Sequence, residues 1–262
     1  PKTINMDNLK LLAIVTGEGE FVNKNLRTGL WLSELTHIYH GAKKQGIEIT
    51  VASPKGGDTP IDPESLNPLL MDEITKTCWE DSIFKNVLQH TKSLDEVSEF
   101  QFDCVYLAGG HGSMYDFPDN IVLQAILKKQ YENEKKVAAI CHGVCGLLNV
   151  TLASGEYLVK DKKLTGFSRA EEILARKERV VPFDLETELK DRGARYEKAL
   201  IPIVVTEPGM VRLPFFPSGQ FIRIDTSLSY KTPSIEQYEE FSGLTMMSVR
   251  LRQPKKGCSP IS

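Results

Sequence analysis

The chain has 262 residues, of which 41% are hydrophobic and 26% are charged, and interspersed acidic and basic side chains leave a formal net charge of −3. This content suits one well-buried α/β domain with insertions, and the lack of a basic stripe interleaved with aromatics argues against nucleic-acid or anionic-membrane partners. No apolar run approaches the roughly 20 residues of a spanning helix, and five cysteines without a compact framework suit a reducing compartment, so we expect a cytoplasmic protein.

Short apolar runs alternate with helical patterns through the first half of the chain. The runs of strand length are residues 9–15, 47–52, 103–108 and 137–140. Helical periodicity covers residues 29–45 and 120–133. Because this alternation is typical of βαβ units, it predicts a mostly parallel central sheet with helices on both faces. Ligands of such sheets gather at the carboxyl ends of the strands.

The remaining segments give weaker patterns. A turn cluster at residues 53–60 predicts a break in regular structure, and the charged stretch 61–100 predicts a small surface insertion with helices at 82–89 and 94–100. Residues 168–179 and 182–190 are expected to be helical. Beyond Leu200, several prolines leave only strand-like pieces at 203–206 and 221–225, followed by a basic tail.

The fourth apolar run stops at Cys141, and a helix-competent stretch with glycines follows at once. The pattern places a sulfur nucleophile on a strand-to-helix corner, as in the hydrolase elbow Gly-x-Ser-x-Gly, with Ala139 and Gly143 in the flanking places. The start of a helix favours a thiolate and can receive an oxyanion. Isolated cysteines in apolar runs are otherwise ordinary core residues. Cys145, four residues on, is either a resolving thiol or a plain helix residue.

Three acidic or basic residues could assist this cysteine. His142 follows it directly, so we expect its ring not to fold back easily onto the thiol but to flank the same pocket, with a carboxylate fixing its tautomer. Either Glu171 or Glu172 could supply that carboxylate, and the pattern alone does not choose between them. Glu34 lies among residues expected to be buried, where a carboxyl stays protonated and can serve as general acid or base. The alternative for Glu34 is a surface residue paired with lysine.

Other histidines have less specific surroundings. With Glu34, His37 and His40 have Glu-x-x-His and His-x-x-His spacings that a metal could use, but no second cluster accompanies them, so we expect no metal. His111 lies in the glycine-rich stretch 109–112 that ends the third apolar run, where glycines allow close backbone approach. It either lines the pocket or caps a turn.

Five segments in order resemble one family. They are Thr-Gly-Leu-Trp-Leu-Ser-Glu-Leu-Thr-His (28–37), Val-Ala-Ser-Pro-Lys-Gly-Gly (51–57), Leu-Ala-Gly-Gly-His-Gly (107–112), Ala-Ala-Ile-Cys-His-Gly (138–143) and Leu-Thr-Gly-Phe-Ser-Arg-Ala-Glu-Glu (164–172). The chain resembles the ThiJ/PfpI superfamily, particularly its glutathione-independent glyoxalase (glyoxalase III) and stress-chaperone branch. The resemblance implies a flavodoxin-like sandwich of the class I glutamine amidotransferase type. It makes residues 1–200 the catalytic domain and 201–262 a divergent segment of the same domain with a mobile tail.

The resemblance also implies roles for individual residues. Cys141 would be the nucleophile, Glu34 the acid or base, His142 its neighbour and Glu172, rather than Glu171, the third member. The backbone N–H groups of Gly110 and His142 would form the oxyanion site, with Gly109 and His111 lining it.

The implied reaction is attack of the thiolate on methylglyoxal or a similar 2-oxoaldehyde, which gives a hemithioacetal and then lactate. It needs neither glutathione, metal nor other cofactor, and the implied assembly is a homodimer. Glutamine hydrolysis is disfavoured because the distant His-x-Glu motif of the amidotransferases is missing. The alternatives are a holding chaperone that binds unfolded clients through the 61–100 insertion, a redox-sensing cysteine protein, a deglycase, and an amidase or peptidase.

Overall fold

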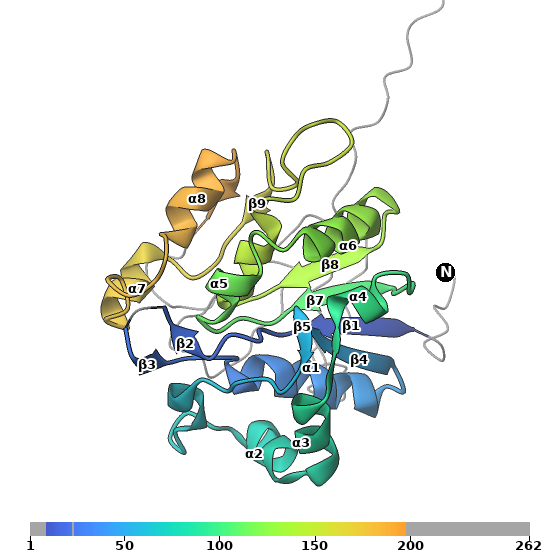
Figure 1. Cartoon of the computed structure of the whole chain (residues 1–262), viewed down its shortest axis with the longest axis vertical. Helices are drawn as coiled ribbons and strands as arrows, with labels where there is room; N and C mark the ends of the chain where they lie inside the picture. Colours follow the sequence, from blue (N-terminus) through green and yellow to red (C-terminus); the bar gives the residue numbers. More distant parts are fainter. Residues whose placement is uncertain (1–8, 23, 198–262) are drawn as a thin grey trace, which may run out of the picture.

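The main sheet of the protein has six strands in the computed structural model, which describes residues 9–22 and 24–197 (Figure 1). Their order is β5-β6-β4-β1-β7-β8, and only the pairing of β5 with β6 is antiparallel. The predicted mostly parallel α/β architecture is therefore confirmed. The strands are β1 (Lys10–Ile14), β4 (Glu48–Ser53), β5 (Lys55–Gly57), β6 (Thr91–Ser93), β7 (Cys104–Leu107) and β8 (Lys136–Ala139).

Helices and two small ribbons complete the described part of the chain. The helices are α1 (Leu32–Lys44), α2 (Glu73–Glu80), α3 (Ser82–Gln89), α4 (Leu94–Val97), α5 (Ser113–Asp116), α6 (Ile121–Glu132), α7 (Arg169–Leu174) and α8 (Leu185–Asp191), and the 3-10 helices are η1 (Pro63–Leu66) and η2 (Cys141–Leu147). The ribbons pair β2 (Glu20–Phe21) with β3 (Leu26–Arg27) and β9 (Lys163–Leu164) with β10 (Arg195–Tyr196). No helix within 9–22 or 24–197 is long and apolar enough to cross a membrane.

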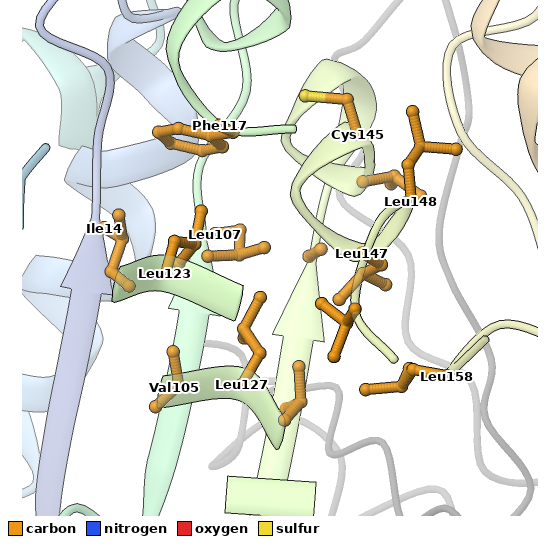
Figure 2. Close-up of a cluster of buried hydrophobic side chains, with 14 of the residues drawn as sticks. Ile14, Val105, Leu107, Phe117, Leu123, Leu127, Cys145, Leu147, Leu148 and Leu158 are labelled. Carbon is orange, nitrogen blue, oxygen red and sulfur yellow. The ribbon is translucent and has the colours of Figure 1, made fainter. Parts of the chain in front are cut away.

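The core has two layers, one on each face of the sheet. Successive side chains of a strand point to opposite faces, so Leu12 and Ile14 of β1 pack with α4 and α6, while Ala13 packs with α1, α2 and α3. Figure 2 shows the first layer, where Leu107 of β7 meets Leu123 of α6. Because β1 is covered on both faces, its sequence is a continuous apolar run, which explains why it was predictable.

Several predicted segments differ in the structure. The turn cluster 53–60 contains β5, because the left-handed residues Gly56 (φ 74°) and Gly57 (φ 86°) let the chain pair antiparallel with β6. The 61–100 segment does more than lie on the surface, since its β6 enters the sheet beside β4. The helix predicted at 168–179 is only α7, because Arg176 (φ 56°) leaves the helical conformation. The C-terminal segment 201–262, with its predicted strands and tail, lies outside the described residues.

A close approach of backbone segments fixes the loop that follows β7. A Cβ atom on Gly110 would lie 2.1 Å from the carbonyl oxygen of Gly29 and 2.6 Å from the amide nitrogen of Trp31. Gly110 also has a φ of 99°, in the region that favours glycine. The loop therefore rests directly on the segment that leads into α1, and only glycine fits at residue 110.

We expect Gly110→Ala to destabilise the protein more than Gly57→Ala. Both positions have left-handed backbone, which costs a side-chain-bearing residue about 1–2 kcal/mol, but a Cβ atom at Gly57 meets nothing within 4 Å. The difference between the two unfolding free energies, measured by urea denaturation, isolates the steric cost at Gly110. Equal losses for the two variants would mean that the close approach is unimportant.

Candidate active site

Cys141 occupies a sharp corner at the carboxyl end of β8. Ile140 is still extended (φ −134°), whereas Cys141 has a φ of 53° and begins η2. A Cβ atom on Gly143 would lie 2.6 Å from the carbonyl oxygen of Leu107, so the residue two places after the cysteine must be small. The predicted strand-to-helix corner is thus present. Positive φ at a residue with a side chain is strained, and such strain is concentrated at functional sites.

The position of His142 differs from the expectation. Its Nδ1 lies 3.3 Å from the Sγ of Cys141, so the ring does fold back onto the preceding thiol. The left-handed backbone at Cys141 turns the chain sharply enough to put both side chains on one side of it. This conformation could not be inferred from adjacency in the sequence, and it places Nδ1 of His142 within hydrogen-bonding distance of the thiol, as a general base requires.

Glu172 is the carboxylate that fixes the His142 ring. Its Oε1 lies 2.6 Å from the Nε2 of His142, and both side chains are buried. Glu171 instead forms a capping box with Ser168 at the start of α7, which settles the choice that the sequence left open. Burial acts to raise the pKa of Glu172, but hydrogen bonds from His111 and His142 outweigh it and lower this pKa to about 2.

Glu34 approaches the same cysteine from α1. Only 3% of its surface is exposed, its Oε2 accepts a 2.6 Å hydrogen bond from the Gly109 amide, and its carboxyl is hydrogen-bonded to the Cys141 side chain. Burial raises the pKa of Glu34 to about 8, although these two hydrogen bonds partly offset the effect. The carboxyl is therefore mostly protonated at neutral pH, as predicted for a buried glutamate. Because Oε2 accepts from the backbone, the proton belongs on Oε1.

The surroundings of Cys141 do not favour a free thiolate in the way that a long helix would. Burial raises the pKa of the thiol well above its ordinary value, and a negative charge on Glu34 adds to this, while the His142 amide acts in the opposite direction. The expected help from a helix terminus is modest because η2 is a short 3-10 helix. Since Glu34 is mostly neutral, burial is the main remaining cause of the raised pKa of the Cys141 thiol.

The backbone N–H groups of Gly109 and Gly110, in the loop after β7, have different roles. The Gly109 amide donates to Glu34, so Gly109 contacts the site through this hydrogen bond. The amides of Gly110 and His142 stay the candidate oxyanion donors. A Cβ atom on Gly109 would lie 2.7 Å from Glu34 Oε2 and 2.9 Å from the His142 nitrogen, so this glycine lets both approach.

His111 belongs to the buried cluster in a way that its sequence position did not indicate. Its Nε2 lies 3.1 Å from Glu172 Oε2, and its ring centroid lies 4.0 Å from that of His142. Among the residues that the structure describes, His111, His142 and Glu172 form the group that could hold a metal ion, since two imidazoles and a carboxylate are a common zinc ligand set.

Two other predicted candidates lie elsewhere. His37 Nε2 lies 2.5 Å from Asp72, which begins α2, so its ring serves contact between helices α1 and α2. Cys145 donates its thiol to the Ser113 carbonyl oxygen at 3.2 Å within the core (Figure 2). It therefore points away from Cys141 and is a plain helix residue, not a resolving thiol.

Comparison with known proteins identifies relatives of the whole fold. The model of the DJ-1/PfpI family matches residues 26–182. Glyoxalase 3 of Candida albicans is 30% identical over 161 residues, which cover 60% of this chain and 68% of that protein. The glutathione-independent glyoxalase HSP31 of Saccharomyces cerevisiae is 27% identical over 197 residues, with coverages of 74% and 83%.

Solved structures give the same picture. The Francisella tularensis Rapid Encystment Protein REP24 superposes with a TM-score of 0.70 and 38% identity, covering 73% of this chain and 84% of that one. The crystal structure of glyoxalase III from Candida albicans superposes with a TM-score of 0.66 and 26% identity, with coverages of 76% and 87%. The similarity thus extends over most of the described residues.

The raised pKa of Glu34 predicts a specific dependence of stability on pH. Between the ordinary value of 4.5 and about 8, the folded chain keeps a Glu34 proton that the unfolded chain has lost. The free energy of unfolding should therefore fall as pH rises through this window. Glu34→Gln, which cannot titrate, should lose this part of the slope in urea denaturation across pH 4.5 to 8. Glu73→Gln, an exposed residue of α2, is the control and should keep the slope. Identical slopes for all three proteins would contradict a buried, protonated Glu34.

Proposed function

Since the chain belongs to the DJ-1/PfpI family, we propose that it is a glutathione-independent glyoxalase that converts methylglyoxal and similar 2-oxoaldehydes to lactate and the corresponding hydroxy acids. Relatives that carry the names glyoxalase 3 and glutathione-independent glyoxalase support this activity. The observation that carries the proposal is the contact of one thiol, that of Cys141, with both the neutral carboxyl of Glu34 and the imidazole of His142.

The first step forms a bond between sulfur and carbon. His142 Nδ1, at 3.3 Å, accepts the thiol proton, and the carboxylate of Glu172 stabilises the resulting imidazolium. The Cys141 thiolate then attacks the aldehyde carbon of the 2-oxoaldehyde. The amides of Gly110 and His142 stabilise the developing alkoxide. The neutral carboxyl of Glu34 gives this alkoxide its proton, which completes the hemithioacetal and leaves Glu34 as a carboxylate.

The second step moves a proton between two carbons of the substrate. The Glu34 carboxylate removes the proton from the carbon that carries sulfur, while the ketone oxygen takes the proton held by the His142 imidazolium, so an enediol forms. Glu34 then returns its proton to the neighbouring carbon, and His142 takes back the proton of the other hydroxyl group, which gives a lactoyl thioester. Glu34 suits this role because a carboxyl with a pKa of about 8 can both take and give a proton near neutral pH. One carbon is oxidised and its neighbour is reduced, so no external oxidant is needed. Water then hydrolyses the thioester, which releases lactate and restores the thiol.

The proposal also covers the substrate, the assembly and the location of the protein. The substrate is a small aldehyde, the assembly is a homodimer as in the resembling family, and the location is cytoplasmic. The four cysteines within the described residues are free thiols, as is usual in a reducing compartment.

The exposed apolar residues of the 61–100 segment favour a second function, that of a holding chaperone. Leu69 is 90% exposed, Ile83 66% and Phe100 56%, so the apolar side chains of an unfolded chain would find apolar partners on this segment. We propose this activity in addition to the enzymatic one, with a surface separate from Cys141.

A methylglyoxal assay without glutathione tests the enzymatic proposal. The wild-type protein should form lactate, Cys141→Ala should lose more than about a thousandfold in rate because it lacks the nucleophile, and Glu34→Gln should lose roughly 10²- to 10⁴-fold as a missing general acid or base. Cys104→Ala is the matched control, since Cys104 lies at the opposite end of β7 from the site, and it should keep full activity. Full activity of Cys141→Ala would contradict the proposed mechanism.

The chaperone proposal predicts a different set of effects. In light-scattering assays with reduced insulin as the aggregating client, the double variant Leu69→Ser/Ile83→Ser should suppress aggregation less than the wild-type protein, while Cys141→Ala should suppress it equally well. Ile121→Ser, which removes an apolar side chain that is 77% exposed outside this segment, is the control and should have no effect. A loss of suppression in Cys141→Ala alone would argue against a separate surface.

A further inference from the structure

The carboxylate of Glu172 joins two imidazoles that come from different elements. Oε1 faces Nε2 of His142 at 2.6 Å, and Oε2 faces Nε2 of His111 at 3.1 Å. We infer that His111 is a positioning residue, which holds the carboxylate plane of Glu172 so that the other oxygen is aimed at His142. Its effect on turnover rests on the proposed function, but its effect on the thiol of Cys141 does not.

The need for a second contact follows from the flexibility of glutamate. The last torsion of a glutamate side chain, between an sp³ and an sp² carbon, has a broad energy profile, so one hydrogen bond does not fix the carboxylate plane. Glu172 lies on α7, a helix of six residues, which constrains it less than a long helix would. A donor on the second oxygen removes this freedom, and His111 supplies it from the loop after β7.

The donors and acceptors of the cluster also set both tautomers. The carboxylate of Glu172 can only accept hydrogen bonds, so both facing Nε2 atoms must carry hydrogen. A neutral His142 therefore has its lone pair on Nδ1, the atom that faces the thiol of Cys141 at 3.3 Å. A neutral His111 likewise has a bare Nδ1, and this atom is buried without a hydrogen-bond partner among the residues described.

The surroundings of His111 favour its neutral form. Burial lowers the pKa of His111, and a positive charge on the stacked ring of His142 lowers it further, against the opposing effects of Glu172 and Asp62. When His142 takes the thiol proton, the pair of imidazoles then carries one positive charge, which lies beside the one carboxylate of Glu172. Glu171, the remaining acidic neighbour on α7, is held by Ser168 and faces away into its capping box.

Two substitutions separate positioning from packing. His111→Phe keeps an aromatic ring between Phe21 and His142 but removes the donor, whereas His111→Gln keeps an N–H near the position of Nε2. We expect His111→Phe to lower kcat roughly 10- to 100-fold with little change in KM, the range for loss of a hydrogen bond to a charged group. Because Glu172 loses a donor that lowers its pKa, the acid side of the rate profile should move to higher pH. His111→Gln should recover most of both changes.

A chemical readout keeps this test independent of the glyoxalase proposal. Mass spectrometry can follow the alkylation of Cys141 by iodoacetamide, with Cys141→Ala as background. The alkylation rate should fall in His111→Phe and recover in His111→Gln. The acid limb of its pH dependence should move to higher pH in His111→Phe and return in His111→Gln. If the wild-type protein does not convert methylglyoxal but these alkylation rates behave as expected, the proposed function fails and the role of His111 stands. His37→Phe, which removes a histidine paired with a carboxylate outside the site, is the matched control and should alter neither rate nor profile.

Two results would overturn the inference. One is an equal loss of rate in His111→Phe and His111→Gln with no shift in the acid limb of the pH dependence, which would indicate a packing role. The other comes from the wild-type protein and does not depend on whether a variant folds: ¹⁵N NMR of the imidazoles at neutral pH should find His111 neutral with hydrogen on Nε2. An imidazolium, or hydrogen on Nδ1, would exclude the hydrogen-bond arrangement on which the role depends.

Discussion

The close approach of the loop after β7 to two other backbone segments is the constraint on which the site depends. Gly110 rests on the segment that leads into α1, and Gly109 lies beside both Glu34 and the amide of His142. Because Gly109 and Gly110 have no Cβ atom, α1, β7 and η2 can all approach the thiol of Cys141. Because α1 and β7 belong to a core that is covered on both faces, this geometry is set by the packing of the fold itself, as preorganised sites require.

The two buried carboxyls of the site have opposite protonation states for identifiable reasons. Glu34 meets one backbone amide and one thiol, neither of which carries a positive charge, so burial dominates and its pKa rises to about 8. Glu172 meets two imidazoles, whose hydrogen bonds outweigh burial and lower its pKa to about 2. A neutral carboxyl therefore contacts the thiol of Cys141, and a carboxylate contacts the imidazole of His142. Environment, rather than residue type, divides the tasks, as in other enzymes with paired carboxyls.

Sequence patterns could predict the parts of the fold that depend on burial. The continuous apolar runs of β1, β4, β7 and β8 and the corner at Cys141 follow from local composition, and family motifs selected Glu34 and Glu172. The short polar strands β5 and β6 could not be found, because three residues have no periodicity and their pairing is decided by the left-handed glycines. The contact of His142 with the preceding thiol depends on a single φ angle. The contact of His111 with Glu172 joins residues that are 61 positions apart in the sequence, and no local pattern encodes it.

The strained backbone at Cys141 is maintained by the packing of the residues that follow it. A left-handed conformation at a residue with a side chain costs of order 1–3 kcal/mol and persists only where the surroundings enforce it. Val144, Cys145 and Leu147 of η2 are buried in the core, where Figure 2 shows Cys145 and Leu147. A relaxed corner would withdraw these side chains from the core, and each buried aliphatic side chain contributes about 1.5–3 kcal/mol. The hydrophobic layer on this face of the sheet thereby stabilises the strained corner that turns His142 toward the thiol, so core packing and the contact of His142 with Cys141 depend on the same seven residues.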